Sequence, residues 1–245
     1  MSDKLTFGKD INEFLNSHGA FNTDNDNQES SDGYGIRLLS AKPSGNEKTV
    51  LKISVSNPSG SEEIEIILLS EHFHRLEFAV GAIDAEIMPE LEYWSEVARA
   101  YSSACSSFAY TPSSLSVLER KLIQKGFPKD IASDAIASIK ARGFVDEGQI
   151  ALRRAQLCVE KRWGRSRVLM KLRDEGFADH SLEAAREFLD SVDFAENCAT
   201  LIKRNFGTVP EDRHERELMY ASLSRRGYST SDIREAQEKL RKLQD

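Results

Sequence analysis

The chemistry that this sequence can offer is concentrated in one basic segment, residues 150–175. The segment holds eight lysines and arginines but only three acidic residues. An arginine guanidinium binds phosphate and carboxylate groups through paired hydrogen bonds, so this cluster suits a phosphate-bearing or acidic partner. The alternative is an ordinary solvated helix face. The basic residues are Arg153, Arg154, Lys161, Arg162, Arg165, Arg167, Lys171 and Arg173, around Trp163 and Gly164, and a smaller pair follows at Arg225 and Arg226.

No arrangement of residues in this sequence predicts catalysis, a cofactor or a metal. His72 and His74 are two residues apart, but no cysteine or carboxylate at ligand spacing completes a site, so we expect two partly exposed histidines. His214 is followed by Glu215, yet the second histidine of a His-Glu-x-x-His motif is missing. The nucleophile turn Gly-x-Ser-x-Gly and the glycine-rich nucleotide loops are also missing. We therefore predict a protein that is not an enzyme.

Cysteine usage and hydropathy indicate the compartment. The three cysteines, Cys105, Cys158 and Cys198, are scattered and form no Cys-x-x-Cys pair, which is typical of reduced thiols. No apolar run approaches the roughly 20 residues that span a bilayer, and the first residues do not resemble a secretory signal. The sequence therefore predicts a cytoplasmic protein without a membrane segment.

The basic segment lies inside a pattern that occurs three times. Three glycines, Gly126, Gly176 and Gly227, are spaced 50 and 51 residues apart. Apolar residues stand eight and four positions before each glycine, on one helix face, and an aromatic residue follows it. Glycine suits the left-handed residue that ends a helix. The apolar pairs are Leu118 and Leu122, Val168 and Leu172, and Met219 and Leu223, and the aromatic residues are Phe127, Phe177 and Tyr228.

A second helix follows each of these stops. Apolar residues recur five or six positions and thirteen positions after the glycines, as expected for a helix that packs back on the first one. A third helix follows at least the first two copies, so the chain contains an internal repeat. We expect Leu122, Leu172 and Leu223 to be equally buried. Helix breaks are predicted at Gly126, Gly143, Gly164, Gly176, Gly207 and Gly227.

The N-terminal part has a different pattern. Alternating apolar residues predict a small antiparallel sheet with strands at 34–42, 49–56 and 62–69. An apolar stripe then predicts a helix from about Leu91 to Ala109. Thr111 and Pro112 are a typical N-cap and first helical turn, and they mark the start of the repeats.

These patterns divide the chain into segments of different charge. Residues 1–110 carry 8 basic and 18 acidic side chains, whereas the remainder carries 25 and 22, within a net charge of −7. The predicted segments are a disordered acidic tail at 1–33, a β-rich extension at 34–90, a connecting helix at 91–110, and helical repeats at 111–164, 165–209 and 210–245. The fold class is mainly α: tandem three-helix repeats in an elongated array, after a small N-terminal β-hairpin or α+β extension.

Four ordered motifs resemble the RecX family of bacterial recombination regulators. The resemblance covers about Tyr110 to Leu240, and the strand-rich part resembles an extension that some members carry. The acidic tail is not part of the family pattern. The motifs are Ser114-x4-Glu119-Arg120-Lys121-Leu122-x3-Gly126-Phe127, Gly143-Phe144-Val145-Asp146-Glu147-x2-Ile150-Ala151, the arginine-rich segment around Trp163-Gly164, and Leu172-x3-Gly176-Phe177.

The resemblance implies an array of tandem three-helix units that modulates RecA without catalysis. Family members bind the RecA filament on single-stranded DNA, inhibit its ATPase and strand exchange, and block its extension. They act in DNA repair, recombination and the SOS response. We accordingly expect a monomer with RecA filaments as partner and a weak contact to DNA. The basic residues named above would form the contact, and Arg162, Arg165 and Arg167 avoid the apolar helix face, so their reversal should leave the fold intact.

A second class of function uses the same arginines. They could bind the phosphates of nucleic acid without regard to base sequence, which would make binding steeply dependent on salt. The net charge of −7 argues against strong autonomous binding to DNA.

Overall fold

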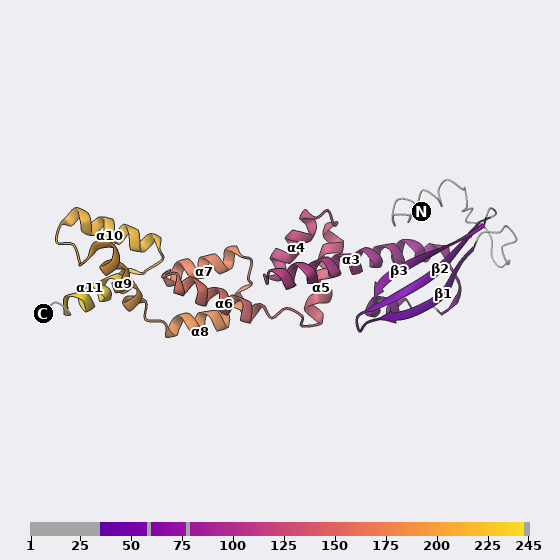
Figure 1. The fold of residues 1–245 in the computed structure, drawn as a ribbon, viewed down its shortest axis with the longest axis horizontal. Coiled ribbons are helices and arrows are strands. Elements are labelled where there is room, and N and C mark those ends of the chain that lie inside the picture. The colour runs from indigo at the N-terminus through magenta and orange to yellow at the C-terminus, as the bar shows by residue number, and fades with distance from the viewer. Residues whose placement is uncertain (1–34, 58–59, 77–78, 243–245) are drawn as a thin grey trace. The chain divides into compact units, whose positions relative to one another are not determined.

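The computed structural model describes residues 35–57, 60–76 and 79–242 (Figure 1). They belong to two compact units. The first contains the described residues up to Ser103 together with Gly126–Ala135, and the second contains Ala104–Lys125 and the described residues from Ile136 onward. The predicted acidic tail at 1–33 lies outside the described residues.

The first unit contains a four-stranded antiparallel sheet in the order β3-β2-β1-β4. All three predicted strands are present, with slightly different ends, and β4 is a short addition that the sequence did not predict. The alternation of side chains sets the register, because Ile53 of β2 stands opposite both Leu38 of β1 and Ile64 of β3. The strands are β1 (Gly35–Ser44), β2 (Lys48–Asn57), β3 (Gly60–Leu69) and β4 (Gly81–Ile83).

One face of this sheet forms the core of the first unit. Leu51, Ile53 and Leu68 are completely buried there. They belong to the same cluster as Met88 and Leu91, at the start of the long helix α3 (Met88–Tyr110). The predicted helix at 91–109 is therefore confirmed, and its first turns cover the sheet.

The short helix α2 (Ser70–Arg75) corrects one expectation. His72 was expected to be partly exposed, but only 4 % of its surface is accessible, because its ring lies 3.9 Å from that of Trp94. His74 is exposed, as expected. The aromatic contact explains the difference, since α2 turns His72 toward α3 and His74 away from it.

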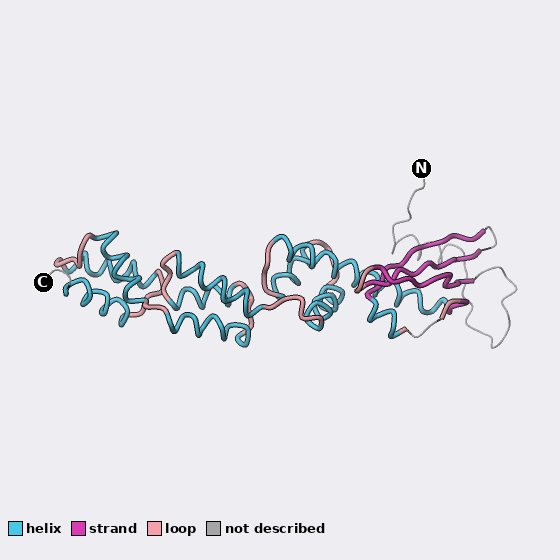
Figure 2. Tube along the Cα trace, turned by 60° about the horizontal axis from the view of Figure 1, so that its bottom comes forward, coloured by secondary structure: helices cyan, strands magenta, loops and turns pink. Residues whose placement is uncertain are grey.

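The rest of the described chain is helical (Figure 2). Each of the six predicted glycine breaks falls between helices, and Asp146 caps α6 as its position suggested. The predicted cap at Thr111 is wrong: Ser114 caps α4, so Pro112 precedes the helix. The helices are α4 (Leu115–Gln124), α5 (Lys129–Ala141), α6 (Glu147–Glu160), α7 (Arg165–Asp174), α8 (Glu183–Ser191), α9 (Phe194–Phe206), α10 (Arg213–Arg225) and α11 (Thr230–Lys242), with short 3-10 turns at Ala85–Ile87 and Asp179–Leu182.

Equivalent positions of the repeat are equally buried. Leu122, Leu172 and Leu223 each expose 1 % or less of their surface, as predicted. Phe177 and Tyr228, which follow the second and third glycines, are also buried. The internal repeat is therefore present in the packing as well as in the sequence.

The groups of helices that pack together begin one helix earlier than the repeats counted from the sequence. Helix α6 packs against α7 and α8, and α9 packs against α10 and α11 (Figure 1). One hydrophobic core runs from α6 to α11. Each three-helix bundle therefore consists of one helix, α6 or α9, and the two helices that follow it in the sequence. The repeat boundaries at 164 and 209 stay a prediction.

Leu172→Ala should lower the free energy of unfolding by about 2–5 kcal/mol, because it leaves a cavity in a core that exposes none of this side chain. The matched control is Met170→Ala on the same helix, where 57 % of the side chain is exposed and the effect should stay within about 0.5 kcal/mol. Urea unfolding followed by circular dichroism measures both. Equal effects of the two substitutions would contradict the assigned core.

Candidate partner-binding surface

Two helix connections that are distant in the sequence meet in the second unit. The turn between α6 and α7 contacts the turn between α10 and α11. The amide of Gly164 donates a 2.7 Å hydrogen bond to the carbonyl of Arg226. Ser166 donates to the carbonyl of Gly227 from its amide at 3.3 Å and from its Oγ at 2.9 Å. This contact brings residues 162–167 of the predicted basic segment next to the predicted pair Arg225 and Arg226.

Both glycines are needed because the two backbones come so close. A Cβ at Gly164 would lie 2.2 Å from the carbonyl carbon of Gly227, and a Cβ at Gly227 would lie 2.5 Å from the Cβ of Arg167. Gly164 has an ordinary φ of −76°, and the left-handed residue of this turn is Arg162, with φ 59°. The helix break predicted at Gly164 therefore requires glycine because a side chain would collide with Gly227, and not because of a left-handed φ.

Arg162 is held on both sides by the protein itself. Its guanidinium donates to Oδ1 of Asn197, a buried residue of α9. Its carbonyl accepts a 3.0 Å hydrogen bond from the hydroxyl of Tyr228. Burial raises the pKa of Tyr228 to about 12, so this hydroxyl keeps its proton at neutral pH. These bonds oppose the tendency of a non-glycine residue to leave the left-handed region.

Arg165 and Arg167 also have partners inside the chain. The guanidinium of Arg167 lies 4.1 Å from the ring centre of Trp163, a cation–π contact. Arg165 forms an ion pair with Asp190 of α8. The expectation that Arg162, Arg165 and Arg167 can be reversed without cost to the fold is therefore not supported by their contacts.

Other residues of the predicted basic segment lie at a second contact, between the start of α4 and the end of α7. There the hydroxyl of Ser114 donates a 2.6 Å hydrogen bond to the carbonyl of Glu175. The Glu175 carboxylate lies 3.8 Å from Arg154 and 3.3 Å from Lys171. Arg173 lies 3.9 Å from Asp179. The basic segment thus divides into two groups of residues. The charges of the second group are largely neutralised by Glu175 and Asp179.

Six of the ten predicted residues have no ion pair with a carboxylate among the described residues: Arg153, Lys161, Arg162, Arg167, Arg225 and Arg226. Arg153 contacts only the side-chain amide of Gln156, at 3.4 Å. Lys161 and Arg225 are exposed, and Arg226 is partly exposed. We call Lys161, Arg225 and Arg226, together with the half-buried arginines at 162, 165 and 167, the junction surface. It presents positive charge on a backbone fixed by the two glycines.

The sequence did not predict that the two turns touch, although a signal was present. Ser114 meets the carbonyl of Glu175, and Ser166 meets the carbonyl of Gly227, in each case 61 residues further along the chain. Small residues therefore recur at two positions of the first and second repeats, Ser114 and Gly164 at one and Ser116 and Ser166 at the other, against the helix end of the next repeat. A search for small residues at the repeat period would have indicated this contact.

Among the described residues, no group of three or more histidine, cysteine or acidic side chains is placed to hold a metal ion. Within the same part of the chain, no helix combines the length and the apolar character that crossing a bilayer requires.

Comparison with known proteins identifies similar chains. No family model matches the sequence. A protein named regulatory protein RecX from Halorhodospira halophila is 29 % identical over 120 residues, which is 49 % of this chain and 74 % of that protein. The protein of the same name from Xanthomonas axonopodis pv. citri is 28 % identical over equal shares of the two chains.

Solved structures show the same fold. A crystal structure of regulatory protein RecX matches with a TM-score of 0.64 and 13 % identity, over 83 % of this chain and 99 % of that one. RecX from Lactobacillus salivarius matches with a TM-score of 0.51 and 17 % identity, over 59 % and 96 %.

The fold is that of the solved RecX structures, a succession of helices that follows a small antiparallel sheet in the sequence. The named relatives and the shared fold bear out the resemblance of this chain to the RecX family. The resemblance predicted from the sequence motifs, and the mainly helical fold class, are therefore confirmed.

Gly164→Ala should destabilise the protein by about 1–3 kcal/mol, because the new methyl group would force the two turns apart. Gly35→Ala is the control, since no described atom lies within 4 Å of its Cβ position. Differential scanning calorimetry of both variants is the measurement. A Gly164→Ala protein that melts like the wild type would show that the glycine contact is not required.

Proposed function

We propose that this protein binds RecA filaments on single-stranded DNA through the junction surface and inhibits their ATPase, extension and strand exchange. The observation that carries the proposal is the convergence of Lys161, Arg225 and Arg226 on one rigid contact between two repeats. Guanidinium groups bind both carboxylates and phosphates, and a filament of protein on DNA presents both.

The proposed mechanism is binding alone. The names of the relatives, which are regulatory proteins, support this mechanism. We propose that the protein acts in the cytoplasm, in DNA repair, recombination and the SOS response, as a monomer in dilute solution. It would need no cofactor, because positioning a charged surface against the filament is sufficient to hinder subunit exchange and nucleotide turnover.

Among the predicted contact residues, Arg225 and Arg226 are the best to test. Their carbonyls support the structure, whereas their side chains have no carboxylate partner among the described residues. Charge reversal of both therefore leaves the backbone bonds in place. It should weaken inhibition of the RecA ATPase on single-stranded DNA at least about tenfold, because like charges would then face the partner.

The matched control for this experiment is Arg120→Glu with Arg234→Glu, which changes the net charge equally at two exposed positions outside the junction surface. Circular dichroism checks the fold of both variants. Inhibition that falls equally in the control would show that only total charge matters. Undiminished inhibition by a folded Arg225→Glu/Arg226→Glu protein would place the contact on another surface.

The same two proteins test the alternative of sequence-independent binding to nucleic acid. Fluorescence anisotropy with labelled single-stranded DNA, in the absence of RecA, measures this binding. We expect weak binding that disappears with rising salt, since only a few phosphates can be neutralised. Tight binding that the Arg225→Glu/Arg226→Glu substitution abolishes would favour the nucleic-acid function.

A further inference from the structure

Two contacts between helices of the second unit share one backbone arrangement. In the α4–α7 contact, the hydroxyl of Ser114 donates to the carbonyl of Glu175, and in the α7–α10 contact the amide of Gly164 donates to the carbonyl of Arg226. The donors are 50 residues apart in the sequence and the acceptors are 51 apart, which is the spacing of the repeat. Each acceptor directly precedes a glycine of the repeat. The backbone therefore presents side chains in an equivalent way at both contacts.

The side chains on this common backbone carry opposite charges. The two residues before the glycine are Asp174 and Glu175 at the α4–α7 contact, and Arg225 and Arg226 at the α7–α10 contact. Asp174 and Arg225 are both exposed, and Glu175 and Arg226 are both partly exposed. The charge at the same place of the repeat thus changes from −2 to +2, a difference of four. Charge is therefore the main difference that a partner would meet between the two contacts.

The carboxylate of Glu175 also engages basic residues of the α4–α7 contact. It lies 3.3 Å from Lys171 on the same helix and 3.8 Å from Arg154 of α6. Lys171 is exposed and Arg154 is partly exposed, so a solute can reach both side chains. An anionic group that approached them would have to displace Glu175 and would meet the charge of Asp174. Like charges placed in this way slow association and weaken it.

At the α7–α10 contact no carboxylate has this role among the described residues. Arg225 and Arg226 occupy the equivalent positions. Within the junction surface only Arg165 forms an ion pair in the described part of the chain, with Asp190 of α8. One backbone arrangement therefore carries neutralised basic residues at one contact and basic residues that are mostly not neutralised at the other.

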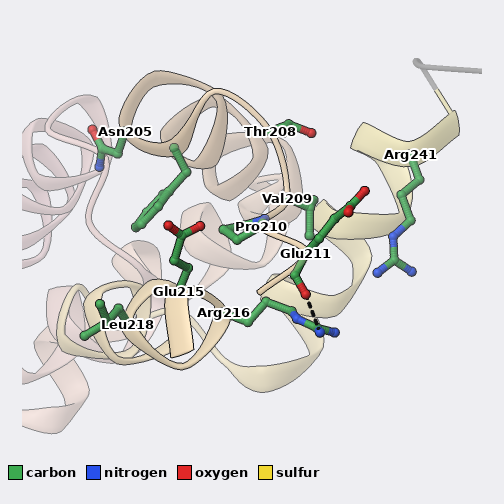
Figure 3. Close-up of a pocket in the computed structure, with 10 residues that line it drawn as sticks. Asn205, Thr208, Val209, Pro210, Glu211, Glu215, Arg216, Leu218 and Arg241 are labelled. Carbon is green, nitrogen blue, oxygen red and sulfur yellow. Dashed lines mark hydrogen bonds between the residues drawn. The ribbon is translucent and has the colours of Figure 1, made fainter. Parts of the chain in front are cut away.

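The start of α10 does not provide another basic surface. It borders a groove of about 1020 Å³ that the ends of α9 and α11 also line (Figure 3). The charges in this groove are balanced, because Glu211 and Glu215 stand there together with Arg216 and Arg241. Arg216 also donates a 2.7 Å hydrogen bond to the carbonyl of Glu211. An anionic partner therefore has no reason to prefer this groove to the junction surface.

We propose that Asp174 and Glu175 are specificity-determining residues, which keep Arg154 and Lys171 from binding anionic groups and so confine the partner to the junction surface. The inference rests on the proposed function, because it takes the junction surface as the surface that binds. It adds the reason why an equivalent contact of the same chain does not bind.

This arrangement fixes how the chain lies on a repeating partner. A chain with two equivalent basic contacts could place either of them on the same anionic feature, and so bind in two registers. Because one contact carries repulsive carboxylates, only one register is favourable, and charge repulsion of this kind is a common source of specificity.

The test uses the full chain and single-stranded DNA as an anionic probe, without RecA. Its starting protein is Arg225→Glu/Arg226→Glu, in which the charge of the junction surface is reversed. Adding Asp174→Asn/Glu175→Gln should raise the affinity for labelled oligothymidylate at low salt at least about fivefold, because Arg154 and Lys171 then become available to phosphates. Adding Lys171→Ser as well should remove most of this gain. Fluorescence anisotropy measures the affinities, and circular dichroism establishes folding.

Matched controls separate this effect from the effect of total charge. Glu62→Gln/Glu65→Gln in the same starting protein removes two exposed carboxylates of β3, in the other unit, and should raise the affinity less than about twofold. Lys140→Ser removes an exposed lysine of α5 outside both contacts, and the gain from Asp174→Asn/Glu175→Gln should survive it.

Three results would overturn the inference: a folded Asp174→Asn/Glu175→Gln protein without a gain in affinity, an equal gain in the β3 control, or a gain that Lys171→Ser leaves undiminished. A failure of the proposed function is distinguishable from these. It would appear as undiminished inhibition of RecA by Arg225→Glu/Arg226→Glu, whereas the experiment with DNA alone would still show whether Asp174 and Glu175 exclude anionic groups.

Discussion

The close approach of Gly164 and Gly227 is the constraint on which the second unit depends. The two backbones meet where neither position has room for a Cβ, and three hydrogen bonds join them. The bonds satisfy amides at the start of α7 and carbonyls at the end of α10, which no helix can satisfy internally. An arginine stands directly beside each glycine, Arg165 after Gly164 and Arg226 before Gly227. The fold thereby fixes both the spacing of the repeats and the place where positive charge accumulates.

The charges at this contact have two roles. Arg162, Arg165 and Arg167 are bound to Asn197, Asp190 and Trp163, so they mainly stabilise the contact. Their neighbours Lys161, Arg225 and Arg226 have no carboxylate partner among the described residues and are at least partly exposed. A surface of this kind is rigid because the arginines beneath it are bound to other residues of the chain. Rigidity lowers the conformational entropy that is lost on binding. We propose that this combination suits a regulator that must hold one geometry against a repeating partner.

Much of the fold follows from local sequence patterns. Glycine followed by an aromatic residue, with leucine four positions earlier, predicts the helix ends around Gly126, Gly176 and Gly227, because these signals act within a few turns. The alternation in residues 35–69 predicts the strands for the same reason. The burial of His72 depends on Trp94, which lies far along the chain. The division of the basic segment into two groups of residues depends on Asp190 and Glu175. Such pairings arise from tertiary packing, which residue type and spacing do not encode locally.

Hydrogen exchange on the wild-type protein, with and without RecA filaments, tests the central claim directly. The amides of residues 161–167 and 225–228 lie at the junction surface, whereas those of β1 to β3 belong to the other unit. Binding at the junction surface should slow exchange at residues 161–167 and 225–228, and leave exchange in the strands unchanged. Saturating filaments that protect only the strands, or only residues remote from both turns, would contradict the account.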